Sequence, residues 1–125
     1  MNLLLDTHVL LWWLADDSSL QSAARDAIRD ESNIVHVSAA TAWEISIKKA
    51  LGKLDAPDDL ANALEVNNFR SLEITVAHAT KAGALPRHHD DPFDRLHIAQ
   101  AQTEQLTLVT HDAKFRAYEI SVIWT

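Results

Sequence analysis

Short apolar runs alternate along the chain with longer segments of mixed polarity. Four runs predict strands, and a shorter run predicts a weaker fifth strand. The four are Asn2–Leu5, Ile34–Val37, Leu106–Thr110 and Ser121–Trp124, and the fifth is Leu72–Ile74. Because strands that alternate with helices build sheets buried between helix layers, the pattern predicts an α/β fold with a central, mainly parallel sheet.

The segments between these runs have the periodicity and the capping residues of helices. In the clearest segment Leu20, Ala24 and Ile28 recur at helical intervals on one face. The expected helices are Val9–Ala15, Ser19–Ile28, Ala39–Leu51, Asp59–Val66, Val76–Gly83 and Pro92–Glu104, with N-caps at Ser38, Asp58 and Thr75.

Composition narrows the class of protein. The chain has 125 residues, a formal net charge of -7 and no cysteine, and its length fits a single domain over residues 1–125. An acidic chain lacks the cationic surplus that neutralises many phosphates, so nucleic-acid binding needs a local site. The apolar stretch Val9–Leu14 is far shorter than the roughly 20 residues of a membrane span. We therefore expect no membrane association and a cytoplasmic location.

Two carboxylates directly follow predicted strands. Asp6 comes after Asn2–Leu5, and Asp112 comes two residues after Leu106–Thr110. Parallel strands bring their carboxyl ends to the same edge of a sheet, where open α/β sheets bind ligands. We therefore expect these two side chains to converge.

Two further carboxylates lie on predicted helices, where an ordinary structural role is also open. Glu44 has Lys48 one turn later, which is also the pattern of a surface ion pair. Asp94 lies in the first turn of the helix that Pro92 opens, which is also a position for an acid that interacts with the helix dipole.

If the four carboxylates converge, their mutual repulsion requires protonation or a cation. Oxygen ligands favour Mg²⁺ or Mn²⁺ over zinc. The seven histidines include no H-x-x-x-H pair, so a zinc site is not expected. A divalent ion held by carboxylates can activate a water for phosphodiester hydrolysis.

Four stretches of the sequence, in this order, resemble the PIN-domain ribonucleases, specifically the VapC-type toxins of bacterial toxin–antitoxin pairs. They are LLLDTH at 3–8, Ser38 with WEI at 43–45, DPFDRLHIAQA at 91–101 and LVTHDAKF at 108–115. The resemblance implies a three-layer fold, Mg²⁺ or Mn²⁺ as cofactor and RNA as substrate. It also implies catalytic roles for Asp6, Glu44, Asp94 and Asp112, with a supporting hydroxyl on Thr110.

Within that resemblance, we interpret Asp6, Asp94 and Asp112 as metal ligands. Glu44 completes the ligand shell or orients the attacking water. The hydroxyls of Thr7 and Thr110 are expected to hold carboxylates in place, although Thr7 is equally suited to cap the first helix.

Neighbouring polar residues have more than one interpretation. Asp91 precedes Pro92 and is expected to be a helix N-cap, while Asp90 is expected to be solvated. Arg95 contacts RNA phosphate or pairs with Asp91. His111 is a candidate substrate contact. A basic rim is a further candidate, formed by Lys48, Lys49, Lys114 and Arg116.

Partner proteins are expected as well. Trp12 and Trp13 lie in an almost wholly apolar helix, so they are either buried in the core or part of a surface for a cognate antitoxin or a second copy in a homodimer. The main alternative to a nuclease is a catalytically silent PIN-fold module that binds RNA or protein. A phosphoacceptor signalling domain is a weaker alternative, because the run Ile34–Val37 ends in Ser38 rather than an aspartate.

Overall fold

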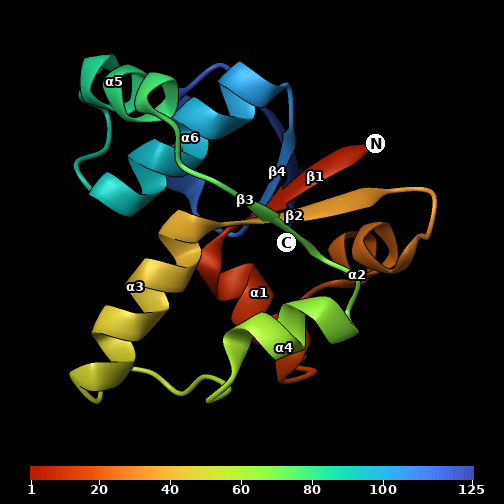
Figure 1. Cartoon of the computed structure of the whole chain (residues 1–125). Helices are drawn as coiled ribbons and strands as arrows, with labels where there is room; N and C mark the ends of the chain where they lie inside the picture. Colours follow the sequence, from red (N-terminus) through yellow and green to blue (C-terminus); the bar gives the residue numbers. More distant parts are fainter.

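The computed structural model of the chain describes all 125 residues. Five strands form one fully parallel sheet in the order β3-β2-β1-β4-β5 (Figure 1). The strands are β1 (Asn2–Leu5), β2 (Ile34–Ser38), β3 (Arg70–Leu72), β4 (Thr107–Thr110) and β5 (Ser121–Trp124). This confirms the predicted α/β fold.

Helices cover both faces of the sheet and complete three layers (Figure 1). They are α1 (Thr7–Leu14), α2 (Ser22–Arg29), α3 (Ala39–Ala50), α4 (Leu60–Val66), α5 (Val76–Ala84) and α6 (Pro92–Glu104), followed by a 3-10 turn, η1 (Ala113–Ala117). None of them is both long and apolar enough to cross a lipid bilayer.

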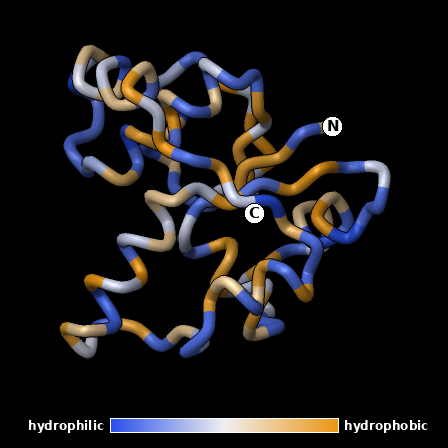
Figure 2. The backbone as a smooth tube through the Cα atoms, in the orientation of Figure 1, coloured by the Kyte–Doolittle hydropathy of each residue, from blue (hydrophilic) through white to orange (hydrophobic).

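Two hydrophobic clusters follow from the alternation of side chains along β1. Leu3 and Leu5 pack into a cluster with residues of α1 to α4, whereas Leu4 packs into a second cluster with α5, α6 and η1. Figure 2 shows hydrophobic positions along the central strands and more hydrophilic ones in the outer turns. Strands that are apolar throughout are typical of a parallel sheet covered on both faces.

Two local predictions were wrong. β3 covers Arg70–Leu72 rather than Leu72–Ile74, because Asn68 adopts a left-handed φ of 58° and turns the chain early toward β2. Asp59, not Asp58, caps α4, since the Asp58 carboxylate is held by a lysine of α3. The predicted caps at Ser38 and Thr75 are confirmed.

The strand order places the ends of β1 and β4 at the centre of one edge. The chain moves outward from β1 to β3 and then returns to the other side of β1 as β4. Ligand crevices of open α/β sheets lie at the carboxyl ends of strands where the order reverses in this way. Asp6 and Asp112 follow these two strands.

Candidate active site

A polar hollow at this edge contains all four predicted carboxylates. Its volume is about 200 Å³, and no hydrophobic residue lines it. The lining residues are Asp6, Thr7, His8, Glu44, Lys48, His89, Asp91, Asp94, Asp112 and Lys114. Five carboxylates therefore face two lysines, which leaves a local excess of negative charge. We call this hollow the acidic pocket.

Asp6 is held by hydrogen bonds to both of its carboxylate oxygens. Its Oδ1 accepts the Val9 N–H at 2.9 Å, and its Oδ2 accepts the hydroxyl of Thr110. Burial raises the pKa of Asp6, while these two hydrogen bonds lower it. Asp6, and not Thr7, therefore caps α1, so the alternative of Thr7 as the N-cap was wrong.

Glu44 is buried, although it also forms the ion pair expected from its spacing. Its Oε1 accepts the hydroxyl of Thr7 at 2.6 Å, and its Oε2 lies 2.5 Å from Lys48 Nζ. The hydrogen bond to Glu44 raises the pKa of Lys48. The pair thus faces the acidic pocket instead of forming an isolated surface contact.

Asp94 is oriented by the way α6 begins. Asp91 caps this helix, as predicted, and its Oδ1 accepts the N–H groups of Phe93 and Asp94 at 2.9 and 3.1 Å. Asp94 is then one turn inside the helix and projects toward His89, whose Nε2 lies 2.6 Å from Asp94 Oδ2. Burial and the neighbouring Asp91 charge raise the pKa of Asp94 to about 7. Asp90 is exposed and outside the acidic pocket.

Asp112 is connected to Asp6 through a single hydroxyl. The Thr110 Oγ1 that donates to Asp6 also accepts the Asp112 N–H at 3.1 Å. The Asp112 carboxylate caps η1 by accepting the Lys114 N–H at 2.9 Å through Oδ1. Its Oδ2 lies 3.8 Å from His89 Nε2.

A series of buried hydrogen bonds behind the pocket runs from Glu44 to a histidine that lies beside Asp94. Thr7 donates its only hydroxyl proton to Glu44, so it accepts from Thr41 across 3.1 Å. Thr41 in turn accepts from His97 Nε2 at 3.0 Å. His97 is fully buried, which lowers its pKa, and its Nδ1 has no hydrogen-bond partner and lies 3.9 Å from Asp94 Oδ1.

Sequence reasoning gave no role to His89, Thr41 or His97. Thr41 and His97 lie three residues from Glu44 and Asp94, one helical turn away on the same face, and that spacing was the available signal. His89 lies in the loop before α6 and offered no periodic signal. Its ring is buried edge-on against Phe115 at a centroid distance of 6.0 Å.

The donor set fits a divalent cation. Ligand atoms of His89, Asp94 and Asp112 lie within 4.8 Å of one another, and Asp6 and Glu44 line the same hollow. Carboxylate oxygens suit Mg²⁺ and Mn²⁺, and an imidazole nitrogen is compatible with Mn²⁺. Burial, and after it the neighbouring charge of Asp91, raises the pKa of Asp94, and a cation bound there would favour the charged carboxylate.

Arg95 does not form the predicted pair with Asp91. Both terminal nitrogens of its guanidinium donate to backbone carbonyls of the last turn of α5 and of the loop that follows it. These carbonyls belong to Ala82, Leu85, Pro86 and His89, at 2.8 to 3.1 Å, with a longer contact to Gly83 at 3.5 Å. Arg95 therefore fixes the loop that carries His89, and these donors are not free for phosphate.

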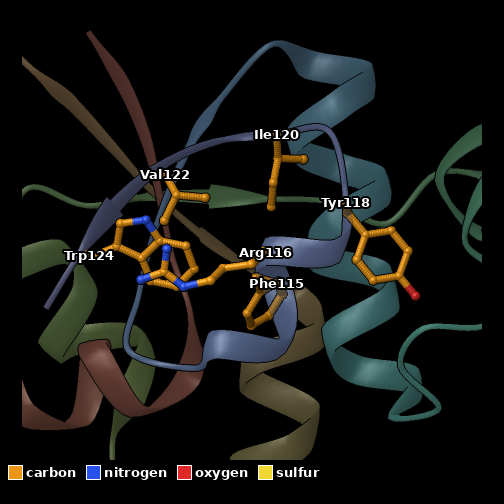
Figure 3. A pocket seen from close by; sticks show the side chains of 6 residues that line it. All are labelled: Phe115, Arg116, Tyr118, Ile120, Val122 and Trp124. Atoms are coloured by element: carbon orange, nitrogen blue, oxygen red, sulfur yellow. The ribbon is translucent and has the colours of Figure 1, made fainter.

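The expected basic rim is only partly present. Lys48 and Lys114 line the acidic pocket. Lys49 instead pairs with Asp58 at 2.7 Å. Arg116 lies over the ring of Trp124, 4.2 Å from its centroid, beside a hollow of about 290 Å³ between η1 and β5 (Figure 3). Two of the four cations are thus positioned to face a phosphate.

The two adjacent tryptophans of α1 have different surroundings. Both pack against the first hydrophobic cluster and are half-buried. Trp13 Nε1 donates to Asn67 Oδ1 at 2.9 Å, and its ring contacts Phe69. Trp12 instead lies beside His111, whose Nδ1 is 2.5 Å from the backbone carbonyl oxygen of Thr125. Trp13 is therefore a core residue, while Trp12 borders the surface next to Asp112.

Comparisons with known proteins agree with this geometry. A family model described as PIN domain matches residues 3–120. Ribonuclease VapC22 of Mycobacterium tuberculosis (strain ATCC 25618 / H37Rv) is 35% identical over 122 residues, covering 92% of this chain and 90% of that protein.

Two solved structures share the fold. The structure of VapBC2 from Rickettsia felis bound to a DNA fragment from their promoter has a TM-score of 0.72 and 15% identity, covering 98% of both chains. DNA-bound VapBC from Salmonella typhimurium has a TM-score of 0.72 and 17% identity, covering 98% of this chain and 97% of that chain. At these identities the likeness concerns the fold alone.

Proposed function

The chain belongs to the PIN-domain family, and from this premise we propose that it is a divalent-metal-dependent endoribonuclease and the toxin of a toxin–antitoxin pair. One observation carries the proposal. Four carboxylates from β1, α3, α6 and the end of β4 meet in one pocket that has no hydrophobic lining. A role limited to protein binding or silent RNA binding gives no reason to gather these charges.

In this proposal Asp6, Asp94 and Asp112 would hold Mg²⁺ or Mn²⁺, and His89 Nε2, 2.6 Å from Asp94 Oδ2, would orient that carboxylate. When bound, the ion would neutralise negative charge at the phosphate and lower the pKa of the attacking water, which makes that water a better nucleophile. Thr110 holds Asp6 in a fixed rotamer and at the same time positions the backbone of Asp112. The carboxylates are thereby preorganised before any ion arrives.

Glu44 and the lysines have complementary roles in the proposed reaction. The second oxygen of Glu44 is bound by Lys48, so Glu44 is fixed as a charged acceptor that can orient the attacking water. Lys48 and Lys114 lie on the pocket wall, where their charges attract the RNA phosphate. The attacking water gives up one proton as its oxygen bonds to phosphorus, the bond from phosphorus to the leaving ribose oxygen breaks, and that oxygen takes up one proton from solvent.

The substrate and partners rest on the relatives. RNA is supported by the name of the ribonuclease that is 35% identical, and an antitoxin by two further solved structures of this fold whose names describe a toxin–antitoxin complex and a member of a toxin–antitoxin family. An exposed apolar stripe on α3 is available for the antitoxin or for a homodimer. It consists of Trp43, Ile47 and Leu51, whose exposed fractions are 60%, 38% and 62%. With these partners we also propose a cytoplasmic location.

The direct test is incubation of the purified chain with structured and unstructured RNAs in Mg²⁺, Mn²⁺ or EDTA. We expect cleavage with either ion, none in EDTA, and recovery when the ion is restored. Cleavage that persists in EDTA would contradict the metal-dependent mechanism. Binding of RNA without cleavage in any ion would support the silent module instead.

A further inference from the structure

A second hollow adjoins the acidic pocket and has a different chemical character. Its volume is about 540 Å³, within the roughly 300–1,000 Å³ of ligand clefts. It shares Asp6, His8 and Asp112 with the acidic pocket, and its other lining residues are Trp12, His111 and Ala113. We call it the aromatic groove. A ligand that spans both hollows would place adjacent chemical groups in each.

Three rings form the wall of the aromatic groove. The rings of Trp12 and His111 meet edge to face at a centroid distance of 5.5 Å, and the His8 ring is tilted against Trp12 at a centroid distance of 6.2 Å. The packing of Trp12 against the core and the contact of His111 with the Thr125 carbonyl fix two of the rings. His8 is exposed on the first turn of α1. The wall is therefore largely preformed.

We propose that the aromatic groove binds one unstacked nucleobase of a single-stranded RNA, next to the phosphate held at the acidic pocket. This inference rests on the proposed nuclease function. Unstacked bases of RNA bind by stacking on aromatic and histidine rings. Such stacking accepts any of the four bases, because every base has a π-face. The two shared carboxylates make the groove continuous with the reaction site, within about one nucleotide of the scissile bond.

The charge around the groove favours a base over other ligands. Asp6 and Asp112 border one end, so a free phosphate or an acidic side chain would be repelled there. A purely apolar side chain would bring these carboxylates next to a surface that cannot donate a hydrogen bond. A nucleobase is uncharged, has flat apolar faces for the rings, and carries N–H groups on its edge that can donate to a carboxylate.

The first experiment measures binding without catalysis. The chain is titrated in EDTA with adenosine and with uridine, which contain a base and no phosphate, and its histidine ring resonances are followed by NMR. We expect the His8 and His111 resonances to shift together, while that of His36, held by the Leu3 carbonyl, stays constant. Unchanged His8 and His111 resonances at saturating nucleoside would overturn the inference, and shifts would support it even if no RNA is cleaved.

The second experiment uses cleavage in Mn²⁺ of a short RNA that is cut at one site. Abasic ribonucleotides are introduced singly on either side of the cut. One of these positions should raise KM roughly 5- to 100-fold, the range of base stacking on aromatic residues. His8→Ala and Trp12→Leu should raise KM for the intact RNA. They should raise KM little further for the abasic RNA, because the substitution and the missing base remove the same contact.

The control variant is His88→Ala, which removes an exposed histidine that lines neither hollow. Its KM should match the unmodified chain for every RNA. Additive losses from the abasic site and from both groove variants, in chains whose melting temperatures are unchanged, would contradict a base at the aromatic groove while leaving the nuclease function intact.

Discussion

The two walls of the acidic pocket carry the same kind of side chain in different settings. The inner wall, Asp6 and Glu44, is almost completely buried at 5% and 4% exposure. The outer wall, Asp94 and Asp112, has side chains that are 21% and 40% exposed. The inner wall is satisfied by donors from the chain itself, whereas Asp94 has only His89 and lies beside the charge of Asp91.

This difference indicates how the pocket is built. Hydrogen bonds within the folded chain hold the two inner carboxylates in fixed positions. The outer carboxylates have fewer hydrogen-bond donors and no ion pair with a lysine or arginine. A bound cation would therefore affect their electrostatic energy more than that of the inner carboxylates. We therefore expect the chain to fold without an ion and still to attract one.

The largest effect is expected from the loss of an outer carboxylate. Asp94→Asn keeps the size of the side chain and an oxygen for His89 but removes the charge. We expect cleavage to fall by at least about 100-fold, since even residues behind a metal ligand account for 10- to 100-fold. Initial rates at saturating Mn²⁺ measure it. Rates close to those of the unmodified chain would mean that the outer wall does not hold the ion.

A smaller loss is expected when the connection between the walls is cut. Thr110→Val removes the hydroxyl that donates to Asp6 and accepts from Asp112. The free energy of unfolding should fall by about 1–3 kcal/mol, because buried groups lose their partner. Activity should fall by about 10- to 100-fold. Thr110→Ser, which keeps the hydroxyl, is the matched control, and equal losses in both variants would rule out the hydrogen bond as the cause.

The pH dependence of stability tests the contribution of Asp94, in the outer wall, without any ion present. The pKa of Asp94 is about 7 in the folded chain, and its ordinary value is 3.8. Between these values the folded state binds more protons than the unfolded state, so this residue makes stability fall as pH rises through that window. Asp94→Asn removes the effect.

The measurement is the melting temperature of both chains in EDTA from pH 5 to pH 8. We expect Asp94→Asn to gain roughly 10 °C relative to the unmodified chain across this range. Melting curves that stay parallel at every pH would show that the outer wall carries no unneutralised charge.

The smallest effect on chemistry is expected at Arg95. Arg95→Lys replaces a guanidinium with two terminal donor nitrogens by a single ammonium. The ammonium cannot bind the carbonyls of both His89 and Ala82, which lie at the two ends of the loop. The melting temperature should fall by a few degrees, while KM for RNA stays within about twofold at temperatures where the variant is folded. A raised KM with an unchanged melting temperature would instead support the hypothesis that Arg95 contacts RNA phosphate.

The carboxylates at the strand ends were the most predictable from the sequence. Asp6 and Asp112 directly follow apolar strands, and a parallel sheet forces such residues to one edge. Glu44 and Asp94 could not be assigned from spacing, because an ion pair and a helix-dipole acid have the same pattern. The family resemblance decided between these interpretations, and the structure brings both residues into the pocket.

Residues that act through distant contacts were not predictable. His89 lies in a loop, and its position depends on carbonyl contacts of Arg95 that no local pattern encodes. Arg95 itself seemed suited to phosphate because it follows Asp94, yet the turn between α5 and α6 places several unpaired carbonyls around its guanidinium. Tertiary context, rather than sequence spacing, determines both roles.

The central claim is that the acidic pocket hydrolyses RNA with water rather than through the ribose 2′-hydroxyl. Cleavage in Mn²⁺ and ¹⁸O-labelled water, followed by mass spectrometry of the product ends, tests it most directly. We predict one ¹⁸O in the terminal phosphate from the first turnover, no 2′,3′-cyclic phosphate, and no product in EDTA or with Asp94→Asn. A cyclic phosphate end, or unlabelled phosphate formed without a divalent ion, would contradict the account.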